Sequence, residues 1–503
     1  DERMAGVGFE LKKVFRDNRG LIGSLKGYSV TAVVTEGPMI LTIVMLASLR
    51  FLMKESHASY RDQEIFLFTL TYVLIFSLIF SNTVLMFSDR FISDCIYKKE
   101  ADRILPSFFG LVFFLLLFGG GAAFLYLLTL PVTPWFRTAA LLQFSAMLIL
   151  WVQIAFLSAV RQYGQVLMGF FAGAIVSILL AMALVRLGIS PLMGAMWGAA
   201  AGFLVMLFLF MAQLIASYPR GNFRIFGFLP ALDQYKILIA TGFFMALGLF
   251  AHNFVIWLSE YQNRVFPTGV FCTRYDIPSF FAALTISPML VQFVVSLEVN
   301  FCRKNRAYFD TILYGGRLAD IRAAKEDMER VLYRELAHMM ELQIVVTLAA
   351  VMFLGNVLSL LGLDAEMTNI FRILCFGYCI YGLFKCLTII LLYFDDRKGA
   401  CVSAALFAIF SVLLTALTLK AGTYTWGMGF LGAGAAASAF ALLRLKWYLK
   451  NLEYHVFCRQ PLFSEPEDGV FHQLEERFSR ADRDFAAKAP GRKSDNPPTS
   501  FRR

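Results

Sequence analysis

Residues 107–130 read SFFGLVFFLLLFGGGAAFLYLLTL, a stretch of 24 residues without a charged side chain. An α-helix rises about 1.5 Å per residue, so about 20 such residues cross the roughly 30 Å hydrocarbon core of a bilayer. A membrane β-strand would be shorter and would alternate apolar with polar residues. The stretch therefore predicts a transmembrane helix.

Comparable apolar runs occur along the whole chain, and we count twelve with this one. They lie at roughly 28–52, 65–87, 107–130, 139–160, 166–186, 194–216, 237–259, 280–301, 338–361, 370–394, 401–420 and 428–448. Hydrophobic residues make up 58% of the 503 positions and charged residues only 16%. A soluble chain is about 45–50% apolar and about 25% charged. We expect an all-α polytopic membrane protein.

The spans divide into two sets of six. Residues 217–236 form a polar stretch with two prolines and two glycines between spans 6 and 7. This indicates an N-lobe over 28–216 and a C-lobe over 237–448, around a central cavity, as in two-lobed transporters. Outside the spans we expect an amphipathic interfacial helix at 5–27, a cytoplasmic loop at 302–337 and a tail at 449–503 that is disordered after about residue 490.

The distribution of Lys and Arg predicts the orientation. The loops on the side of the termini carry 18 of them and the opposite loops about eight. Cytoplasmic loops carry the excess of basic residues, so both termini are expected in the cytoplasm of a multi-pass inner-membrane protein. The same bias, with attraction to lipid headgroups, accounts for the net charge of +10. The sequence has no basic stripe with interleaved aromatic residues, so nothing in it indicates nucleic-acid binding.

Motifs for enzymatic chemistry are missing from the sequence. It has no P-loop, HExxH, GxSxG or Cys/His metal spacing. We expect no enzyme activity, no cofactor and no metal, and we interpret the eight cysteines as small packing residues. Asp395-Asp396 is expected to be a solvated turn between spans.

Polar residues within the spans are the functional candidates, because a charge at the centre of a span costs about 2.5–3.5 kcal/mol on insertion scales. The candidates for the transport path are Glu36, Pro38, His252, Asn253, Tyr275, Asp276, Gln292, Glu298 and Lys385. Glu298 and Lys385 could also snorkel to the interface, and His252 could be a simple helix contact. Glu36 and Lys385 have opposite charge and similar depth, so we hypothesise that they approach each other across the cavity.

The loop 302–337 is mixed in charge and helical in composition. It could simply extend spans 8 and 9 into the cytoplasm, and it could also bind a cytoplasmic partner. Arg322, Arg330 and Arg334 are the candidates for docking.

Four segments resemble the Pel exopolysaccharide transporter family, PelG. They are MAGVGFELKK (4–13), YDIPSFFAALTISP (275–288), FVVSLEVNF (293–301) and ADIRAAKEDMERVL (319–332). Tyr275, Asp276 and Glu298 fall on matching blocks, and the Gly37-Pro38 step also fits. Glu36 departs from the small polar residues associated with that position.

The resemblance implies the multidrug/oligosaccharidyl-lipid/polysaccharide flippase superfamily, with two six-helix lobes and alternating access. It implies export of a Pel-like, hexosamine-rich polymer to the biofilm matrix. The implied partners are a cytoplasmic PelF-like glycosyltransferase, PelD/PelE-like membrane proteins that respond to cyclic-di-GMP, and membrane lipids. Three alternatives stay open: a flippase for lipid-linked oligosaccharides, a cation-coupled multidrug exporter that uses Glu36, and a non-transporting scaffold for a synthase.

Overall fold

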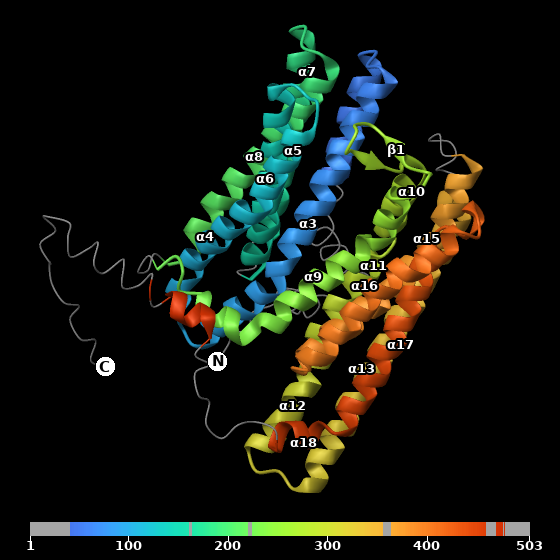
Figure 1. Ribbon diagram of the computed structural model, residues 1–503. Helices are drawn as coiled ribbons and strands as arrows, with labels where there is room; N and C mark the ends of the chain where they lie inside the picture. The colour runs from blue at the N-terminus through green and yellow to red at the C-terminus, as the bar shows by residue number, and fades with distance from the viewer. Residues whose placement is uncertain are drawn as a thin grey trace, which may run out of the picture.

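The computed structural model describes residues 41–159, 163–219, 224–355, 364–458, 469–475 and 477. Among these residues, eleven helices are long and apolar enough to cross a membrane (Figure 1). The predicted all-α membrane architecture is confirmed. The first predicted span, 28–52, lies partly outside the described residues, and its second half is helical over 41–55. The expected interfacial helix at 5–27 lies wholly outside them.

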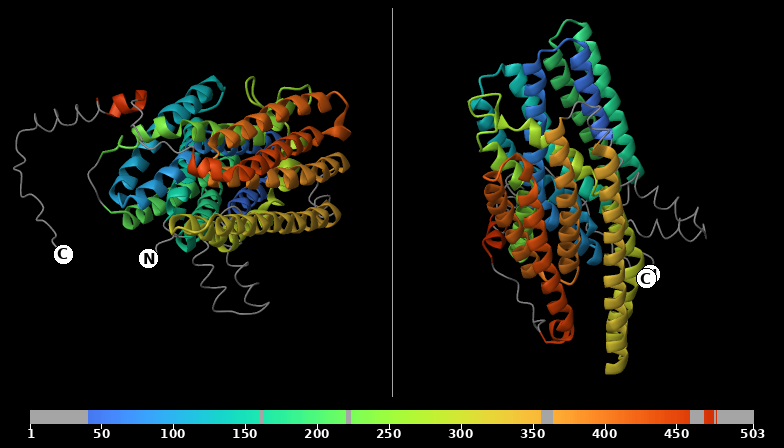
Figure 2. Two further views of the ribbon diagram at one scale, coloured as in Figure 1. Left: turned by 90° about the horizontal axis from the view of Figure 1, so that it is seen from below. Right: turned by 90° about the vertical axis from the view of Figure 1, so that its right-hand side faces the viewer.

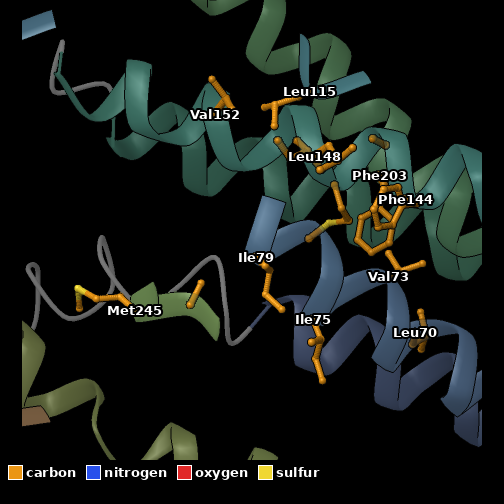
Figure 3. Packing of buried hydrophobic residues seen from close by; sticks show 14 of the residues in the cluster. Leu70, Val73, Ile75, Ile79, Leu115, Phe144, Leu148, Val152, Phe203 and Met245 are labelled. Atoms are coloured by element: carbon orange, nitrogen blue, oxygen red, sulfur yellow. The ribbon is translucent and has the colours of Figure 1, made fainter. Parts of the chain in front are cut away.

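The N-lobe is built from long helices joined by short turns. They are α3 (Tyr60–Tyr97), α4 (Ile104–Leu115), α5 (Gly121–Thr129), α6 (Pro134–Ala159), α7 (Tyr163–Arg186) and α8 (Pro191–Ser217). A π-helical turn, Leu116–Gly120, joins α4 to α5, so the two form one span. The core of this lobe is apolar: Figure 3 shows side chains of α3, α4, α6 and α8 meeting there, among them Val73, Leu115, Phe144 and Phe203.

The C-lobe follows the same pattern. Its elements are α9 (Leu229–Trp257), β1 (Asn263–Arg264), β2 (Val270–Phe271), α10 (Thr273–Leu284), α11 (Ser287–Val295), α12 (Cys302–Leu313), α13 (Leu318–Ala349), α15 (Ala365–Tyr393), α16 (Arg397–Leu419), α17 (Met428–Lys450) and α18 (Leu452–Phe457). The short strands β1 and β2 pair as an antiparallel hairpin.

Span 8 differs from its predicted extent of 280–301. It begins at Thr273 and is broken at Thr285-Ile286 into α10 and α11. Pro288 lies in the first turn of α11, where a missing backbone N–H costs nothing, and this position favours a new helix start over an unbroken one. Tyr275 and Asp276 are therefore on a helix, in its first turn.

The segment 302–337 forms a helical hairpin that projects from one end of the bundle (Figure 1). Helix α12 turns at Gly315, whose φ of +76° favours glycine, and α13 returns through the whole bundle. Lys304 on α12 pairs with Asp327 on α13 at 3.2 Å. We call this end of the molecule the loop end, and the opposite end, which carries β1 and β2, the hairpin end.

Helix α9 lies between the two lobes and packs against α3 of the N-lobe and α16 of the C-lobe (Figures 1 and 2). Glycines permit this double contact. A side chain at Gly242 would overlap the carbonyl oxygen of Asn82 on α3, and one at Gly248 would lie 2.5 Å from the ring of Phe407 on α16. We call the α3–α9 contact the seam. The seam joins the lobes over most of the length of α9.

The Asp395-Asp396 turn is solvated only in part: Asp395 is exposed as predicted, and Asp396 is not. Asp396 is buried, and its carboxylate accepts two hydrogen bonds from Arg444 on α17, at 2.6 and 2.9 Å. It also caps α16 by accepting from the Gly399 backbone N–H. The prediction was wrong for Asp396 because its cation lies 48 residues further on, where the sequence gives no sign of contact. The turn therefore anchors α17 to the ends of α15 and α16.

Replacement of Gly242 by alanine tests the seam. The new methyl group would push α9 away from the α3 backbone, so we expect Gly242→Ala to destabilise the protein by about 1–3 kcal/mol. Gly121 on α5 is the matched control, since nothing lies within 4 Å of a Cβ built there. Gly121→Ala should be neutral or stabilising by about 0.5–1 kcal/mol. Thermal unfolding of the detergent-purified variants measures both effects, and equal stability of the two would contradict the close contact.

Candidate functional site

A cluster of polar side chains lies within the C-lobe near the hairpin end. Its members are His252, Asn253 and Trp257 on α9, Tyr275, Asp276 and Ser279 on α10, and Tyr378 on α15. We call it the polar cluster. The β1–β2 hairpin reverses the chain between α9 and α10, so residues 23 positions apart meet. Four of the predicted path residues, His252, Asn253, Tyr275 and Asp276, thus come together.

Asp276 organises one half of the cluster. Its carboxylate accepts hydrogen bonds from Asn253 Nδ2 at 2.7 Å, from Trp257 Nε1 at 2.9 and 3.0 Å, and from the backbone N–H of Cys272 at 3.0 Å. Within the described residues no cation pairs with it. Since hydrogen bonds to a charged group contribute about 1.5–3 kcal/mol each, three donors can hold a carboxylate without a counter-ion. The carboxylate in turn fixes the indole of Trp257.

His252 organises the other half. Its side chain is fully buried, and Nδ1 lies 2.8 Å from the hydroxyl of Tyr275. The rings of Phe430 on α17 and Tyr378 pack around it, with the Phe430 centroid at 4.2 Å. Tyr378 shares a 3.1 Å hydrogen bond with Ser279. Among the residues that the structure describes, Nε2 of His252 has no hydrogen-bond partner. The arrangement is aromatic with a few neutral hydrogen-bonding groups.

Trp257 connects the polar cluster to the N-lobe. Its ring stacks on Tyr72 of α3 with centroids 5.2 Å apart and planes 3° apart, and Tyr72 stacks in turn on Tyr126 of α5 at 5.7 Å. The hydroxyls of Tyr72 and Tyr126 donate to the backbone of the hairpin at Val270 and Thr268. We call Tyr126, Tyr72 and Trp257 the aromatic stack. It closes the seam at the hairpin end.

A second set of contacts closes the seam at the loop end. The hydroxyl of Tyr235, where the backbone of α9 is kinked, donates to Asp94 of α3. The guanidinium of Arg397, at the start of α16, lies 4.8 Å from the centre of the Tyr235 ring, and that of Arg90 lies 5.9 Å away. Arg397 also pairs with Asp395 at 2.7 Å. Tyr235 thus joins α3 of one lobe to α16 of the other.

None of the residues of these two closures was predicted from the sequence, although one signal for them exists. Phe68, Tyr72 and Phe76 recur at four-residue intervals along α3, which places them on one helix face. Phe76 stacks on Phe254 of α9 at 5.6 Å, next to the Tyr72–Trp257 pair. The spacing indicates an aromatic face, but it does not identify which helix that face meets.

The other predicted path residues lie elsewhere. Glu36 and Pro38 are outside the described residues. Gln292 is buried on α11 and donates to Ser296 at 3.1 Å. Glu298 is in the π-helical segment Ser296–Phe301. Lys385 is half-buried on α15, seven residues beyond Tyr378, or about 10 Å further toward the loop end.

The predicted docking arginines all lie on α13 and face different neighbours. Arg330 pairs with Asp327 at 2.9 Å and Arg334 with Glu335 at 3.4 Å, and both arginine side chains are largely exposed. Arg322 lines a groove between α13 and α17. Arg330 and Arg334 are not among the residues that line this groove.

Substitution of Asp276 tests the polar cluster. Asn at this position has one acceptor oxygen for three donors and turns its own N–H group toward one of them. We expect Asp276→Asn to cost about 1–3 kcal/mol of stability and to release the indole of Trp257. The exposed Asp102 provides the control Asp102→Asn. Thermal unfolding followed by tryptophan fluorescence measures the effect, and a variant as stable as the control would show that the hydrogen bonds are not needed.

Comparison with solved structures identifies the fold. A MOP superfamily transporter from Pyrococcus furiosus superposes with a TM-score of 0.62 at 11% identity, covering 90% of this chain and 100% of the other. An outward-facing multidrug resistance MATE family transporter of the same superfamily gives 0.57 at 13% identity, with 90% and 99% covered. A mutant MATE transporter of Vibrio cholerae gives 0.59 at 11% identity, with 88% and 98% covered.

Comparison of the sequence gives a second result, in addition to the likeness in fold. No curated protein matches the chain in sequence. The model of one protein family, PelG, described as an exopolysaccharide exporter (EPS-E), matches residues 4–457, which is nearly the whole chain. The chain belongs to the PelG exopolysaccharide exporter family.

Proposed function

We propose that this protein carries a Pel-like, hexosamine-rich polysaccharide across the cytoplasmic membrane, along a path between its two lobes. Membership of the family supports polysaccharide export by a membrane transporter. The chemical class of the polymer, its delivery to the biofilm matrix and the residues of the path are the parts that we add. The aromatic stack and its link to the polar cluster carry the proposal.

The orientation follows from the basic residues. The α12–α13 hairpin belongs to the more basic set of loops, which has 18 Lys and Arg residues in the sequence against about eight in the opposite set, so we place the loop end in the cytoplasm. The hairpin end, with the aromatic stack, then faces outward. The polymer would enter near Tyr235 and leave near Trp257.

The chemistry of the aromatic stack suits sugars. A hexose ring has apolar C–H faces and a rim of hydroxyl or amide groups. Binding sites for such molecules combine aromatic walls with a few fixed polar groups. The three rings of the stack cover one another here and would expose their faces when the seam opens. Next to the stack lie the carboxylate of Asp276 and the buried Nε2 of His252, which has no partner in the described chain. A neutral sugar carries no charge of its own, so it can hydrogen-bond to either group without the cost of desolvating a charged ligand.

The two closures of the seam suggest alternating access. An aromatic pair contributes about 0.5–1.5 kcal/mol beyond its buried area, and a cation–π contact about 0.5–2 kcal/mol. The contacts at the hairpin end and at the loop end are thus similar in strength, and neither is too strong to open. We propose that the lobes part along α3 and α9 at one end while the contacts at the other end hold.

Partners supply the polymer in this proposal. A cytoplasmic PelF-like glycosyltransferase would make the chain, and PelD/PelE-like proteins would respond to cyclic-di-GMP. The projecting α12–α13 hairpin is the proposed docking element, with the exposed Arg330 and Arg334 as contacts. The pairing of Glu36 with Lys385 across the path also remains a proposal, in which Lys385 lies between the polar cluster and the cytoplasm.

The experiment replaces Tyr72 in cells that secrete the polymer. Tyr72→Leu keeps the bulk and removes the aromatic face, so we expect secreted polymer to fall about tenfold while intracellular polymer accumulates, which corresponds to about 1.4 kcal/mol of lost stacking. Tyr72→Phe keeps the face and should export nearly normally. The exposed Tyr424 at the hairpin end gives the control Tyr424→Leu.

Protein levels in the membrane must be equal for this comparison. Export by Tyr72→Leu at the level of the control would contradict a path past the aromatic stack. A parallel fall in secreted and intracellular polymer would instead indicate a role in synthesis, as expected for a scaffold.

A further inference from the structure

A groove of about 750 Å³ lies between α13 and α17 at the loop end. Toward the middle of the bundle the lining is apolar, with Tyr333, Leu442 and Leu443. Toward the loop end it is charged, with Arg322, Lys446 and Lys450 among the residues. The groove is thus amphipathic along its length.

Positive charge prevails in the groove once its ion pairs are assigned. Lys325 pairs with Glu453 of α18 at 2.8 Å and lies 4.0 Å from Glu329. Burial is the largest single effect and would raise the pKa of the Glu453 carboxyl, but the hydrogen bond from Lys325, a backbone hydrogen bond and the charges of Lys325 and Arg322 together hold the pKa below its ordinary value. Glu453 is therefore ionised at neutral pH, and this pair is neutral overall.

Three cations and two carboxylates of the lining remain, a net charge of +1, because the one charge of Lys325 is already offset by Glu453 and cannot also offset that of Glu329. Arg322, Lys446 and Lys450 have no carboxylate within 4 Å among the described residues, and Glu326 has no cation within that distance in the same part of the chain. Three like charges at one end of a groove repel one another unless an anion lies between them. The three cations at the loop end of the groove therefore favour an anionic ligand.

The groove lies at the level of the membrane surface. Arg444 on α17 binds Asp396 in the α15–α16 turn, and the hydroxyl of Tyr448 donates to Phe394 at the end of α15. Residues of α17 beyond Arg444 therefore extend past the ends of α15 and α16. Trp447 is half exposed at this level, with the Arg444 guanidinium 4.5 Å from its ring centre. Tryptophan is enriched at this depth in membrane proteins.

The apolar end of the groove faces the hydrocarbon region. Leu443 is 70% exposed, one turn of α17 above Lys446. On α13 the face that carries Tyr333 continues upward to Met340 and to Ile344, which is 47% exposed. The cations thus lie at headgroup depth, directly below exposed aliphatic side chains.

We propose that this groove binds an anionic phospholipid of the membrane leaflet at the loop end. The phosphate lies among Arg322, Lys446 and Lys450, and an acyl chain runs along Leu442, Leu443 and Tyr333. Basic pockets between transmembrane helices recognise anionic headgroups in this way. An acidic protein segment would satisfy the cations, but it would leave the exposed leucines without an apolar partner.

The lipid holds α13 and α17 together where they do not pack on each other. Arg322 lies in the groove with the lipid, while Arg330 and Arg334 do not line it. Only the latter two remain available to a cytoplasmic partner. The proposal does not depend on the exported polymer, because it rests on the groove alone.

Thermal unfolding of the full-length protein in detergent tests the site. Added phosphatidylglycerol should raise the Tm by more than about 3 °C, and zwitterionic phosphatidylcholine should raise it far less. The double variant Lys446→Gln, Lys450→Gln should lose most of the difference between the two lipids. The matched control removes two exposed lysines at the same end of the molecule, Lys98→Gln and Lys99→Gln, and should keep it.

Two further arms identify the occupant. Leu443→Gln keeps every charge and should also weaken the effect of phosphatidylglycerol, whereas soluble glycerol phosphate should not replace the lipid. Native mass spectrometry of the wild-type protein should show phosphatidylglycerol retained, which does not depend on how well any variant folds.

Three results would overturn the proposal. One is an equal Tm shift with both lipids, and another is an undiminished shift in the groove variant. The third is a photo-crosslinker at position 443 that captures a protein in native membranes and no lipid.

Discussion

The close packing of α9 against both lobes at once is the constraint on which the rest of the structure depends. A helix in lipid gains little from the hydrophobic effect, so association rests on tight contact between surfaces, and small residues permit it. Gly242 lets α9 touch the backbone of α3, and Gly248 lets it touch α16. The same helix then delivers Tyr235 to one end of the seam and Trp257 to the other.

The polar cluster provides hydrogen-bond partners for polar groups that lie within the spans. Polar groups within the spans find no water, so most of them are paired inside the protein. Asp276 has three donors around it and His252 has Tyr275, while Trp257 uses its N–H for Asp276 and its ring for Tyr72. One side chain therefore links hydrogen bonds inside the C-lobe to stacking between the lobes. A substitution in the polar cluster should therefore alter the aromatic stack, and a substitution in the stack should alter the cluster.

Much of the fold could be predicted from the sequence, because a run of about 20 apolar residues has few alternatives in a membrane. The site was predictable only in part. His252, Asn253, Tyr275 and Asp276 stood out as polar residues in apolar surroundings or within recognisable segments. Tyr72, Trp257 and Tyr235 did not, since aromatic residues are common in every span and their roles arise from which helices meet. Asp396 was misjudged for the same reason: its partner Arg444 is near in space and distant in the chain.

We propose that the lobes must part along the seam for polymer to pass. Cysteines in place of Phe76 and Phe254, whose rings stack across the seam at 5.6 Å, would lock α3 to α9 when joined by a short, reducible bifunctional thiol reagent in a protein whose eight native cysteines are replaced. Cysteines in place of Phe170 and Phe210, 5.4 Å apart within the N-lobe, are the control. Our expectation is that the seam cross-link stops polymer secretion, that a reductant restores it, and that the control cross-link has no effect. Secretion that continues with the seam fully cross-linked would contradict it.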